Sequence, residues 1–578
     1  MSKTPQFDAK IKTILETAKP GERICPLTGK KWFLTAEELE LCRSFQVPPN
    51  EIEPTTMLDF FGGFNTGLAA FWKTHAKTGK PILAAIHPDS PFKALPYVEW
   101  QAEDHTSFGR EADFSRSVME QIWDLETTVP FDAARNVDVD ENSVAIASIK
   151  IIDSHLIFGS YGCQRCFYTV SLGWGEDCID IGGGGRIFRT FASSASSDIA
   201  DSMYIFHSRS CHSSFFLFDC QDCEYCFGAT NQHHKKYIFF NRQLTKDEYE
   251  QKIKDINLSN RDTLETFLAK FYQLWREEGA WPPNFNVRSD DCDGEELEDC
   301  VRCQDGYFLI KCNDCLHVRF ALNGERNLYT SGNAGANNCY MTTGSSQSMN
   351  LKFCQASAQT INSEYCINCL ECENCFACVS LFRKKFCIFN KQYAEEEYWQ
   401  LVDQLKCKML DEGEYGKFFS AKYSLPGFQF SGGALSVGYS EEDLRLFNAP
   451  ILDPARGQVL APTPVAGSTL QVSDIPDNFS DIDPNKFVGV PIYDPEAGRS
   501  YSVTKAEYEI YKEKHWPFPR QHFVTRLTDL FHYRNLPAKE KTVCFACQQP
   551  VDTYKNIKFP VRKVYCRACY LKFLEKIS

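Results

Sequence analysis

Four cysteines near the end of the chain have the residue type and spacing of a metal site. They form two C-x2-C pairs with eighteen residues between them. Thiolates in two close pairs can surround Zn²⁺ tetrahedrally, and a site with four cysteine ligands keeps no open position for catalysis. The sequence therefore predicts one structural zinc ion as the cofactor. Its ligands would be Cys544, Cys547, Cys566 and Cys569.

The central cysteines have a different pattern. Those in 369–378 recur at every third residue, and one tight run cannot easily place four thiolates around an ion. We favour the interpretation that they are small buried hydrophobic groups within strands. Metal binding stays open for the whole central set, which is Cys300, Cys303, Cys312, Cys315, Cys369, Cys372, Cys375 and Cys378.

The C-terminal segment is basic although the whole chain is acidic. The 578 residues have a net charge of −14, whereas 499–578 contains 16 Lys and Arg against 7 Asp and Glu. Cations interleaved with aromatic side chains suit irregular or single-stranded RNA. The competing interpretation is a solvated basic face around an aromatic core. The candidate RNA contacts are Arg520, Arg526, Arg534, Lys555, Lys558, Arg562, Lys563 and Arg567.

The chain lacks the motifs of common catalytic sites. It contains neither G-x-x-x-x-G-K-[ST] nor H-E-x-x-H. The glycine run 182–185 has no strand–loop–helix context, so it predicts a tight turn rather than a phosphate site. No signal peptide and no run of about eighteen apolar residues occurs. We expect a non-enzymatic cytoplasmic protein with reduced cysteines, no membrane contact and no small-molecule substrate.

Two internal repeats organise the sequence. Cys226 and Asn241 recur as Cys375 and Asn390, in each case 149 residues later. A second offset, of 469, relates 25–48 to 494–517. Carried onward, this offset aligns the four zinc ligands with residues that do not bind zinc as a set, so the N-terminal copy is expected to fold by packing instead. The aligned residues are His75, Thr78, Tyr97 and Trp100.

Short apolar strands separated by Gly, Ser, Asn and Asp clusters occupy the middle of the chain. This rhythm is typical of stacked β-rungs with helical caps. One cap is expected to begin at Thr245, which forms a capping-box pattern with Glu248. The predicted fold class is mainly β with helical caps. Two duplicated β-solenoid-like halves would be flanked by two pseudo-equivalent zinc-ribbon-type modules, and whether the halves form one solenoid stays open.

Six segments follow from these patterns. The predicted domains are a degenerate zinc-ribbon-like module at 1–105, a connecting helical segment at 106–150, a first β-repeat half with its cap at 151–290, a second half with its cap at 291–425, a linker at 426–490 and a basic zinc-ribbon module at 491–578.

These motifs resemble an uncharacterised cysteine-rich zinc-ribbon family that is multiplied in Candidate Phyla Radiation (Patescibacteria) genomes. The resemblance covers nearly the whole chain. It is carried by 25–32, 113–116, 375–378 and 563–569, and most specifically by Lys-Lys-Phe-Cys-Ile-Phe-Asn-Lys-Gln-Tyr at 384–393 before an acidic helix. It implies a bacterial cytoplasmic setting and a further four-cysteine site in the C-terminal module, but no reaction. That site's positions hold Asp494, Ala497, His522 and Thr525.

The leading functional hypothesis is a zinc-binding interaction protein that docks on RNA, or on a ribonucleoprotein such as the ribosome, through its basic C-terminal module. The alternative is a protein-binding or self-assembling structural scaffold without nucleic acid. A thiol-redox or metal-buffering enzyme is a third hypothesis, which rapid alkylation of several cysteines in the folded protein would support.

Overall fold

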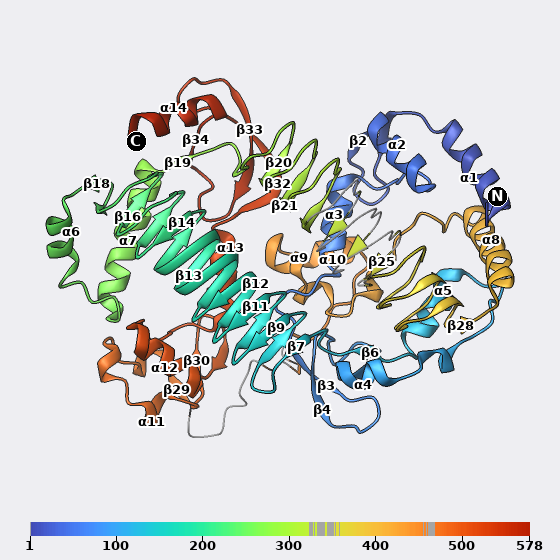
Figure 1. The fold of residues 1–578 in the computed structure, drawn as a ribbon, viewed down its shortest axis with the longest axis horizontal. Coiled ribbons are helices and arrows are strands. Elements are labelled where there is room, and N and C mark those ends of the chain that lie inside the picture. The colour runs from blue at the N-terminus through green and yellow to red at the C-terminus, as the bar shows by residue number, and fades with distance from the viewer. Residues whose placement is uncertain are drawn as a thin grey trace. The chain divides into compact units, whose positions relative to one another are not determined.

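The computed structural model shows a chain made mostly of strands, with helices between them (Figure 1). It describes residues 2–322, 328, 330–331, 342–343, 352, 354–355, 357, 359–454, 456–457, 459 and 469–577. The chain divides into two units, each built from two separated segments. Unit 1 contains Met1–Arg135 and Asn286–Gly457, and unit 2 contains Asn136–Phe285 and Gln458–Ser578. The chain therefore passes from one unit to the other three times.

Unit 2 contains a series of parallel strands that we call the first ladder. Paired residues on neighbouring strands are twelve residues apart, as in Phe167↔Ile179 and Met203↔Phe215. The ladder ends in an antiparallel pair, Ile238↔Gln243. Its strands are β7 (Val137–Val139), β8 (Val144–Ile146), β9 (Ile149–Ile152), β10 (His155–Phe158), β11 (Tyr161–Gln164), β12 (Phe167–Glu176), β13 (Ile179–Phe206), β14 (Arg209–His212), β15 (Phe215–Phe218), β16 (Phe227–Thr230), β17 (Ile238–Phe239) and β18 (Arg242–Gln243).

A left-handed residue at every third position bends this ladder into short sides. Asp177, Asp180, Gly183, Arg186 and Arg189 all have positive φ values, between 45° and 84°. Because stacked partners are twelve residues apart, each turn of the chain has four such corners. Gly, Asp and Asn enter the left-handed region more readily than other residues, which explains their clusters between the apolar positions.

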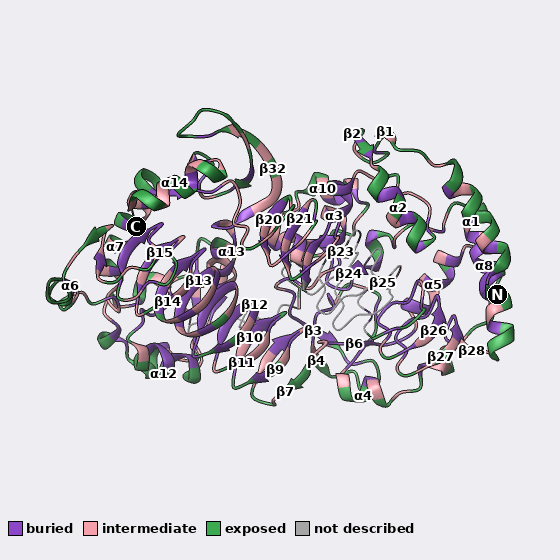
Figure 2. Ribbon diagram, turned by 45° about the horizontal axis from the view of Figure 1, so that its top comes forward, coloured by how far each residue is buried: buried purple, intermediate pink, exposed green. Residues whose placement is uncertain are grey.

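Small side chains fill the interior of the first ladder. Cys163, Cys166, Leu172, Cys178 and Ile181 are buried in one cluster at a spacing of three or a multiple of three. Figure 2 shows the ladder strands largely in the buried colour. Four inward side chains per turn leave little volume, and a close-packed interior of that width accepts cysteine, serine and aliphatic groups.

Unit 1 contains the second ladder, which has the same register. Tyr307 pairs with Arg319 and Cys375 pairs with Cys387, again twelve residues apart. This ladder also ends in an antiparallel pair, Ile388↔Lys391. Its strands are β20 (Gly294–Glu298), β21 (Gly306–Ile310), β22 (Arg319–Leu322), β23 (Thr330–Ser331), β24 (Thr342–Thr343), β25 (Cys354–Gln355), β26 (Glu373–Phe376), β27 (Lys385–Ile388) and β28 (Lys391–Gln392).

Each unit also contains one terminal module, and the two modules share an order of elements. The N-terminal module of unit 1 comprises α1 (Pro5–Thr17), β1 (Gly21–Ile24), β2 (Lys31–Leu34), α2 (Ala36–Phe45), α3 (Pro54–Gly62), β3 (Phe71–Thr74), β4 (Pro81–Ala84), β5 (Ala94–Leu95), α4 (Tyr97–Ala102), η1 (His105–Phe108), α5 (Val118–Glu126) and β6 (Phe131–Asp132). The C-terminal module of unit 2 comprises β29 (Leu470–Gln471), α11 (Pro484–Phe487), β30 (Ile492–Asp494), β31 (Arg499–Tyr501), α12 (Lys505–Lys514), α13 (Phe523–His532), β32 (Asn535–Val543), β33 (Pro550–Asn556), β34 (Lys563–Val564) and α14 (Arg567–Ile577). The sequence β–β–α–α–β–β–β–α is common to both.

Each module packs on the ladder of its own unit through a buried glutamate. In unit 2, Tyr168 donates a hydrogen bond of 2.9 Å to Glu507 on α12. In unit 1, Glu38 on α2 lies 4.0 Å from the ring of His317. Both glutamates are fully buried. Glu507 follows Glu38 by 469 residues and His317 follows Tyr168 by 149, so the two contacts occupy matching positions under both sequence offsets.

Helices close the far end of each ladder. The capping box predicted at Thr245 is confirmed: Thr245 and Glu248 exchange both hydrogen bonds at the start of α6 (Lys246–Ile253). The following helix, α7 (Arg261–Glu278), buries Leu264, Phe271 and Trp275. In unit 1, α8 (Glu395–Asp411) begins at the position that matches the start of α6 under the 149 offset.

The segment predicted as a linker is divided between the two units. Its first part includes α9 (Gly432–Ser436) and α10 (Glu441–Leu446) and belongs to unit 1, whereas 469–490 belongs to unit 2. The stretch 460–468 lies outside the described residues. Within the part of the chain that the structure describes, no helix is both long and apolar enough to cross a membrane.

Candidate metal centre

The four predicted ligands meet at one point of the C-terminal module. The sulfur atoms of Cys544, Cys547, Cys566 and Cys569 all lie within 4.8 Å of one another, and this is the only group of that kind among the described residues. The Sγ atoms of Cys547 and Cys566 are 3.9 Å apart. Zinc–sulfur bonds of about 2.3 Å in a tetrahedron imply sulfur–sulfur distances of about 3.8 Å. The donor set therefore fits a tetrahedral ion of the size of zinc.

Two turns of the backbone bring the sulfurs together. Cys544 and Cys547 lie in the turn between β32 and β33, where Gln548 has a left-handed φ of 60°. Cys566 and Cys569 lie between β34 and the first turn of α14. The amide of Cys566 donates to the sulfur of Cys544 at 3.2 Å, so the second turn is held against the first.

The thiols ionise unequally in the absence of a cation. Burial opposes ionisation of Cys544, but the amides of Cys547, Cys566 and Ala546 outweigh it and lower its pKa to about 6. Hydrogen bonds with the Cys566 and Cys547 sulfurs raise the pKa of Cys569 to about 12. Four thiolates at this separation repel one another, so a divalent cation is what allows all four to ionise together.

At the other predicted four-ligand positions, side-chain hydrogen bonds replace a metal. His75, at the position of Cys544, accepts the amides of Lys77 and Thr78 on Nδ1 at 3.1 and 3.3 Å. Its Nε2 lies 3.1 Å from Glu99. The imidazole thus receives the two amide hydrogens that, in the other module, point to a sulfur. Of the two aromatic residues at the remaining ligand positions, Trp100 is buried and Tyr97 is partly exposed.

The site at Asp494 is closed in the same way. Its carboxylate accepts the amides of Glu496 and Ala497 at 3.0 and 3.2 Å, and the amide of His522 at 2.8 Å. The matching site of the N-terminal module has Glu53 bonded to Thr56. These hydrogen bonds satisfy backbone amides that would otherwise donate to a metal-bound thiolate.

The central cysteines lie inside the ladders. All eight of those left open in sequence are buried, with at most 1% of their surface exposed. Their sulfurs contact backbone carbonyls of the neighbouring turn, as Cys300 does with Leu309 at 3.4 Å and Cys369 with Cys378 at 3.6 Å. This arrangement agrees with the interpretation that they are small core side chains.

The eight predicted RNA contacts divide into three groups. The side chains of Arg526 and Arg562 are 12% and 3% exposed and form ion pairs with Asp180 and Glu540, and Arg534 is 3% exposed. Intramolecular partners also engage Arg520, Lys558 and Lys563, through Asp477, Asp529 and the Glu277 carbonyl. Lys555 and Arg567 are exposed. Only part of the basic segment is therefore presented to solvent, which its composition did not reveal.

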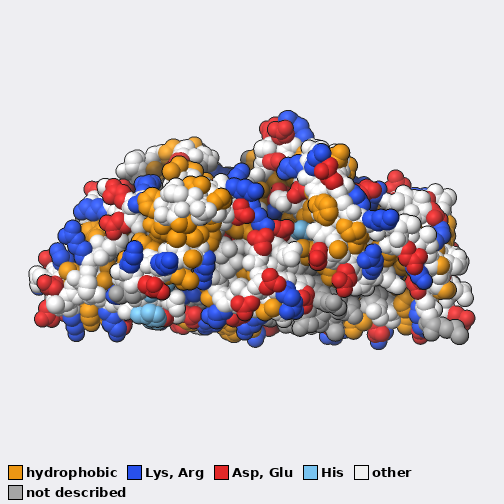
Figure 3. Space-filling model, turned by 90° about the horizontal axis from the view of Figure 1, so that it is seen from above, with side chains coloured by type: hydrophobic (Ala, Val, Ile, Leu, Met, Phe, Trp, Pro, Cys, Tyr) orange, Lys and Arg blue, Asp and Glu red, His pale blue; other side chains and the backbone are white. Residues whose placement is uncertain are grey.

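Ion pairs between successive turns neutralise the sides of both ladders. Arg189 pairs with Asp201 at 2.6 Å, Arg302 with Asp314 at 2.6 Å and Arg383 with Glu371 at 2.7 Å, each pair separated by twelve residues. Cationic and acidic side chains are interspersed on the face in Figure 3. Such pairs add little stability singly, but each of them places a cation beside a carboxylate on the ladder surface.

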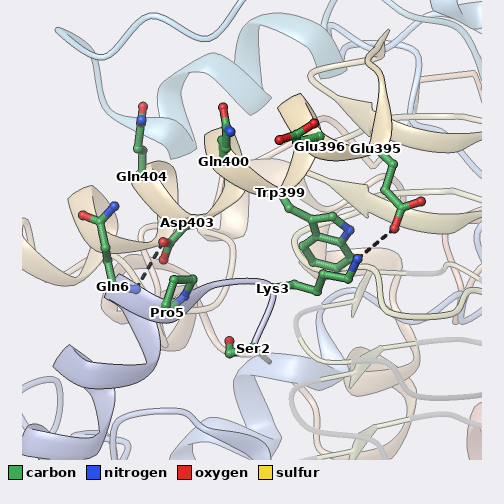
Figure 4. Close-up of a pocket in the computed structure, with 10 residues that line it drawn as sticks. All are labelled: Ser2, Lys3, Pro5, Gln6, Glu395, Glu396, Trp399, Gln400, Asp403 and Gln404. Carbon is green, nitrogen blue, oxygen red and sulfur yellow. Dashed lines mark hydrogen bonds and ion pairs between the residues drawn. The ribbon is translucent and has the colours of Figure 1, made fainter.

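One groove in unit 1 lies between α1 and α8 (Figure 4). Its volume is about 630 Å³. Lys3 pairs with Glu395 across it at 3.0 Å, and Asp403 accepts the amides of Gln6 and Phe7 at the start of α1. These polar groups attach α1 to α8 and do not form a catalytic arrangement.

No protein-family model matches the chain, and a comparison with curated proteins gives no significant match. Arguments about function therefore depend on the residues themselves.

Proposed function

We propose that this protein is a non-enzymatic interaction protein whose zinc-stabilised C-terminal module docks on RNA. One observation carries the proposal. Phe545, in the turn between the first two cysteines, is 50% exposed, and the Lys563 ammonium lies 5.2 Å from the centre of its ring. An exposed aromatic face beside a cation suits a stacked base next to a phosphate.

The charge of the surrounding region supports the same proposal. Residues 535–578 contain nine Lys and Arg against three Asp and Glu, a net charge of +6. Four thiolates and one Zn²⁺ reduce this to about +4. Cations on the surface of the module include Lys541, Lys555, Arg567 and Lys572. The docking surface that we propose therefore consists of Phe545, Lys563 and these cations. It excludes Arg526, Arg534 and Arg562, whose side chains are largely covered.

In this proposal the remainder of the chain is a rigid framework. The constant twelve-residue register supports two β-solenoid halves, and the matching glutamate contacts of Glu38 and Glu507 support a duplication of the whole module-and-ladder unit. Parallel stacked turns with paired surface charges are suited to holding a module in place. The ladder cysteines serve as core side chains within this framework.

The test measures binding of a short, labelled single-stranded RNA of mixed sequence by fluorescence anisotropy, at low and at high salt. Replacing Phe545 by alanine should weaken binding by about 1–3 kcal/mol, the value of one stacked base. The double variant Lys555→Glu, Arg567→Glu should also weaken binding and reduce its salt dependence.

The matched control is Phe33→Ala. Phe33 is 61% exposed on β2 of unit 1, so its loss removes a similar aromatic surface outside the proposed site. Absent or salt-insensitive binding, or equal effects of the two phenylalanine variants, would refute the RNA proposal. The alternative of a protein-binding or self-assembling scaffold would then take its place.

A further inference from the structure

In unit 1, the chain beyond α4 packs into the end of the second ladder. α4 stops at Ala102, and the chain then enters η1. Asp104 pairs with Lys384 at 2.9 Å. The side-chain amide of Asn390 donates to the carbonyl of His105 at 3.2 Å, and the amide of Arg110 donates to the carbonyl of Phe389 at 3.0 Å. Asn390 is fully buried as a result.

The matching place in unit 2 is an open pocket. Its volume is about 530 Å³, and its lining includes Lys235, Asn241 and Gln243. These residues precede Lys384, Asn390 and Gln392 of unit 1 by 149 positions. Asn241 binds the ladder amide of Thr230 at 2.9 Å, as Asn390 binds that of Val379 at 2.8 Å. The two recesses thus have the same framework, but no backbone segment among the described residues fills the one in unit 2.

The pocket in unit 2 is open because the helix that follows the zinc ligands is longer than its counterpart in unit 1. α14 continues to Ile577, whereas α4 ends at Ala102, which is the position of Leu571 under the 469 offset. Phe573 therefore stands where unit 1 has Asp104, and it lines the pocket as part of the helix. Its ring lies 5.5 Å from that of Tyr565, which lines the pocket as well.

The polar groups of the pocket retain the chemistry of the filled recess. Lys235 is half-buried, and Lys563 adds a second cation to the lining. The side-chain amide of Asn241 donates to the carboxylate of Glu278 at 2.8 Å, in the place of the His105 carbonyl. Glu278 is exposed at the end of α7, so an incoming backbone carbonyl can replace it by a side-chain rotation.

We propose that this pocket binds a short peptide segment of a partner protein, with an acidic side chain on Lys235 and the next backbone carbonyl on Asn241. The occupant has the chemistry of Asp104 and His105 in unit 1. A cavity of this volume, with a mostly polar lining beside the rings of Tyr565 and Phe573, is of the size that binds compact ligands. The inference depends on the proposed equivalence of the units and does not depend on RNA binding.

The test uses a synthetic peptide with the sequence of 103–110, Glu-Asp-His-Thr-Ser-Phe-Gly-Arg, added to the full-length zinc-loaded protein. Saturable binding by anisotropy of the labelled peptide is expected. Lys235→Glu should weaken it by about ten- to a hundredfold, the contribution of a charge-assisted hydrogen bond. Lys236→Glu is the matched control, because Lys236 is exposed, pairs with Glu224 and does not line the pocket.

A charge reversal makes the assignment specific. A peptide with lysine in place of its aspartate should bind the wild-type protein poorly and regain affinity for Lys235→Glu. Phe545→Ala should leave peptide binding unchanged, and Lys235→Glu should leave RNA binding unchanged, so the two proposals fail separately. No peptide binding, or equal binding to wild type and Lys235→Glu, would overturn the inference.

Discussion

Replacing Arg526 by methionine is expected to destabilise unit 2 and to leave unit 1 unchanged. The guanidinium of Arg526 makes two hydrogen bonds to Asp180, of 2.7 and 3.1 Å, and lies 4.9 Å from the ring centre of Tyr168. The side chain of Asp180 is 3% exposed. Methionine is the residue that the N-terminal module has at the matching position, Met57, so a side chain of this kind suits the helix.

The expected magnitude follows from what the substitution leaves behind. Removal of one partner of a buried ion pair costs about 3–5 kcal/mol, since the other charge stays buried without compensation. With a urea dependence of about 3 kcal/mol per molar, the unfolding midpoint of unit 2 should fall by about 1–1.7 M. In the double variant Asp180→Asn, Arg526→Met neither charge remains and asparagine suits the left-handed φ at this position, so the loss should be much smaller.

Hydrogen exchange measured at increasing urea can separate the two units in one experiment. Peptides from β13 should lose protection at lower urea in Arg526→Met, whereas peptides from α8 in unit 1 provide the internal control. Below the new midpoint, RNA affinity should equal that of the wild type, because Arg526 is not part of the proposed docking surface.

Two outcomes would refute this reasoning. Unchanged protection of β13 would mean that the buried pair carries no stability. A double variant as unstable as Arg526→Met alone would mean that the loss comes from packing of the arginine side chain rather than from the unpaired carboxylate.

Three further predictions concern metal, thiols and pH. Chelation of the zinc, or Cys566→Ser, should unfold 535–577 and spare unit 1, because metal binding contributes about 10–16 kcal/mol to such modules; one zinc per chain by mass spectrometry and selective loss of exchange protection would check this. Iodoacetamide should label the half-buried Cys292 in the native protein and spare Cys369, which is fully buried; rapid labelling of Cys369 would contradict the core assignment. Burial raises the pKa of Glu507 to about 7 from an unfolded value of 4.5. The native state therefore holds this proton more tightly, and its contribution to stability is lost as pH rises from about 4.5 to 7. In urea titrations, the free energy of unfolding of Glu507→Gln relative to that of the wild type should rise by about 3 kcal/mol over that pH range. A difference in unfolding free energy that stays constant with pH would contradict the assignment.

Local features of this fold could be predicted from sequence because neighbouring residues determine them. The capping box at Thr245 and the buried face of α7 depend on residues within one or two helical turns. The Cys-x2-Cys pairs likewise encode a local turn that aims two sulfurs at one point. In these cases spacing alone carried the geometry.

The three-residue period of the ladders can be seen in the sequence at 369–378, but the backbone geometry that produces it cannot. An alternating strand has a period of two, whereas here one residue of every three faces inward, because a left-handed corner follows each pair of extended residues. The sequence therefore indicated buried cysteines without giving the twelve-residue turn.

Contacts between distant segments could not be predicted from the sequence. Tyr168 and Glu507 are far apart in the chain, and no local pattern pairs the first ladder with the last module. For the same reason, Arg526 and Arg562 counted as surface cations although each has an intramolecular carboxylate partner. Composition gives the number of charges, and tertiary structure determines which of them reach solvent.

The division of each unit into two separated segments has a consequence for synthesis. The first ladder leaves the ribosome well before 458–578, the segment against which it packs. At about 5–20 residues per second, translation of 286–457 takes on the order of 10–35 s. During that time the ladder face around Tyr168 has no module to cover it, and the zinc ligands have not yet been made. A nascent chain stalled before residue 458 should thus expose this face to chaperones, and zinc supply should affect the last step of folding rather than the first.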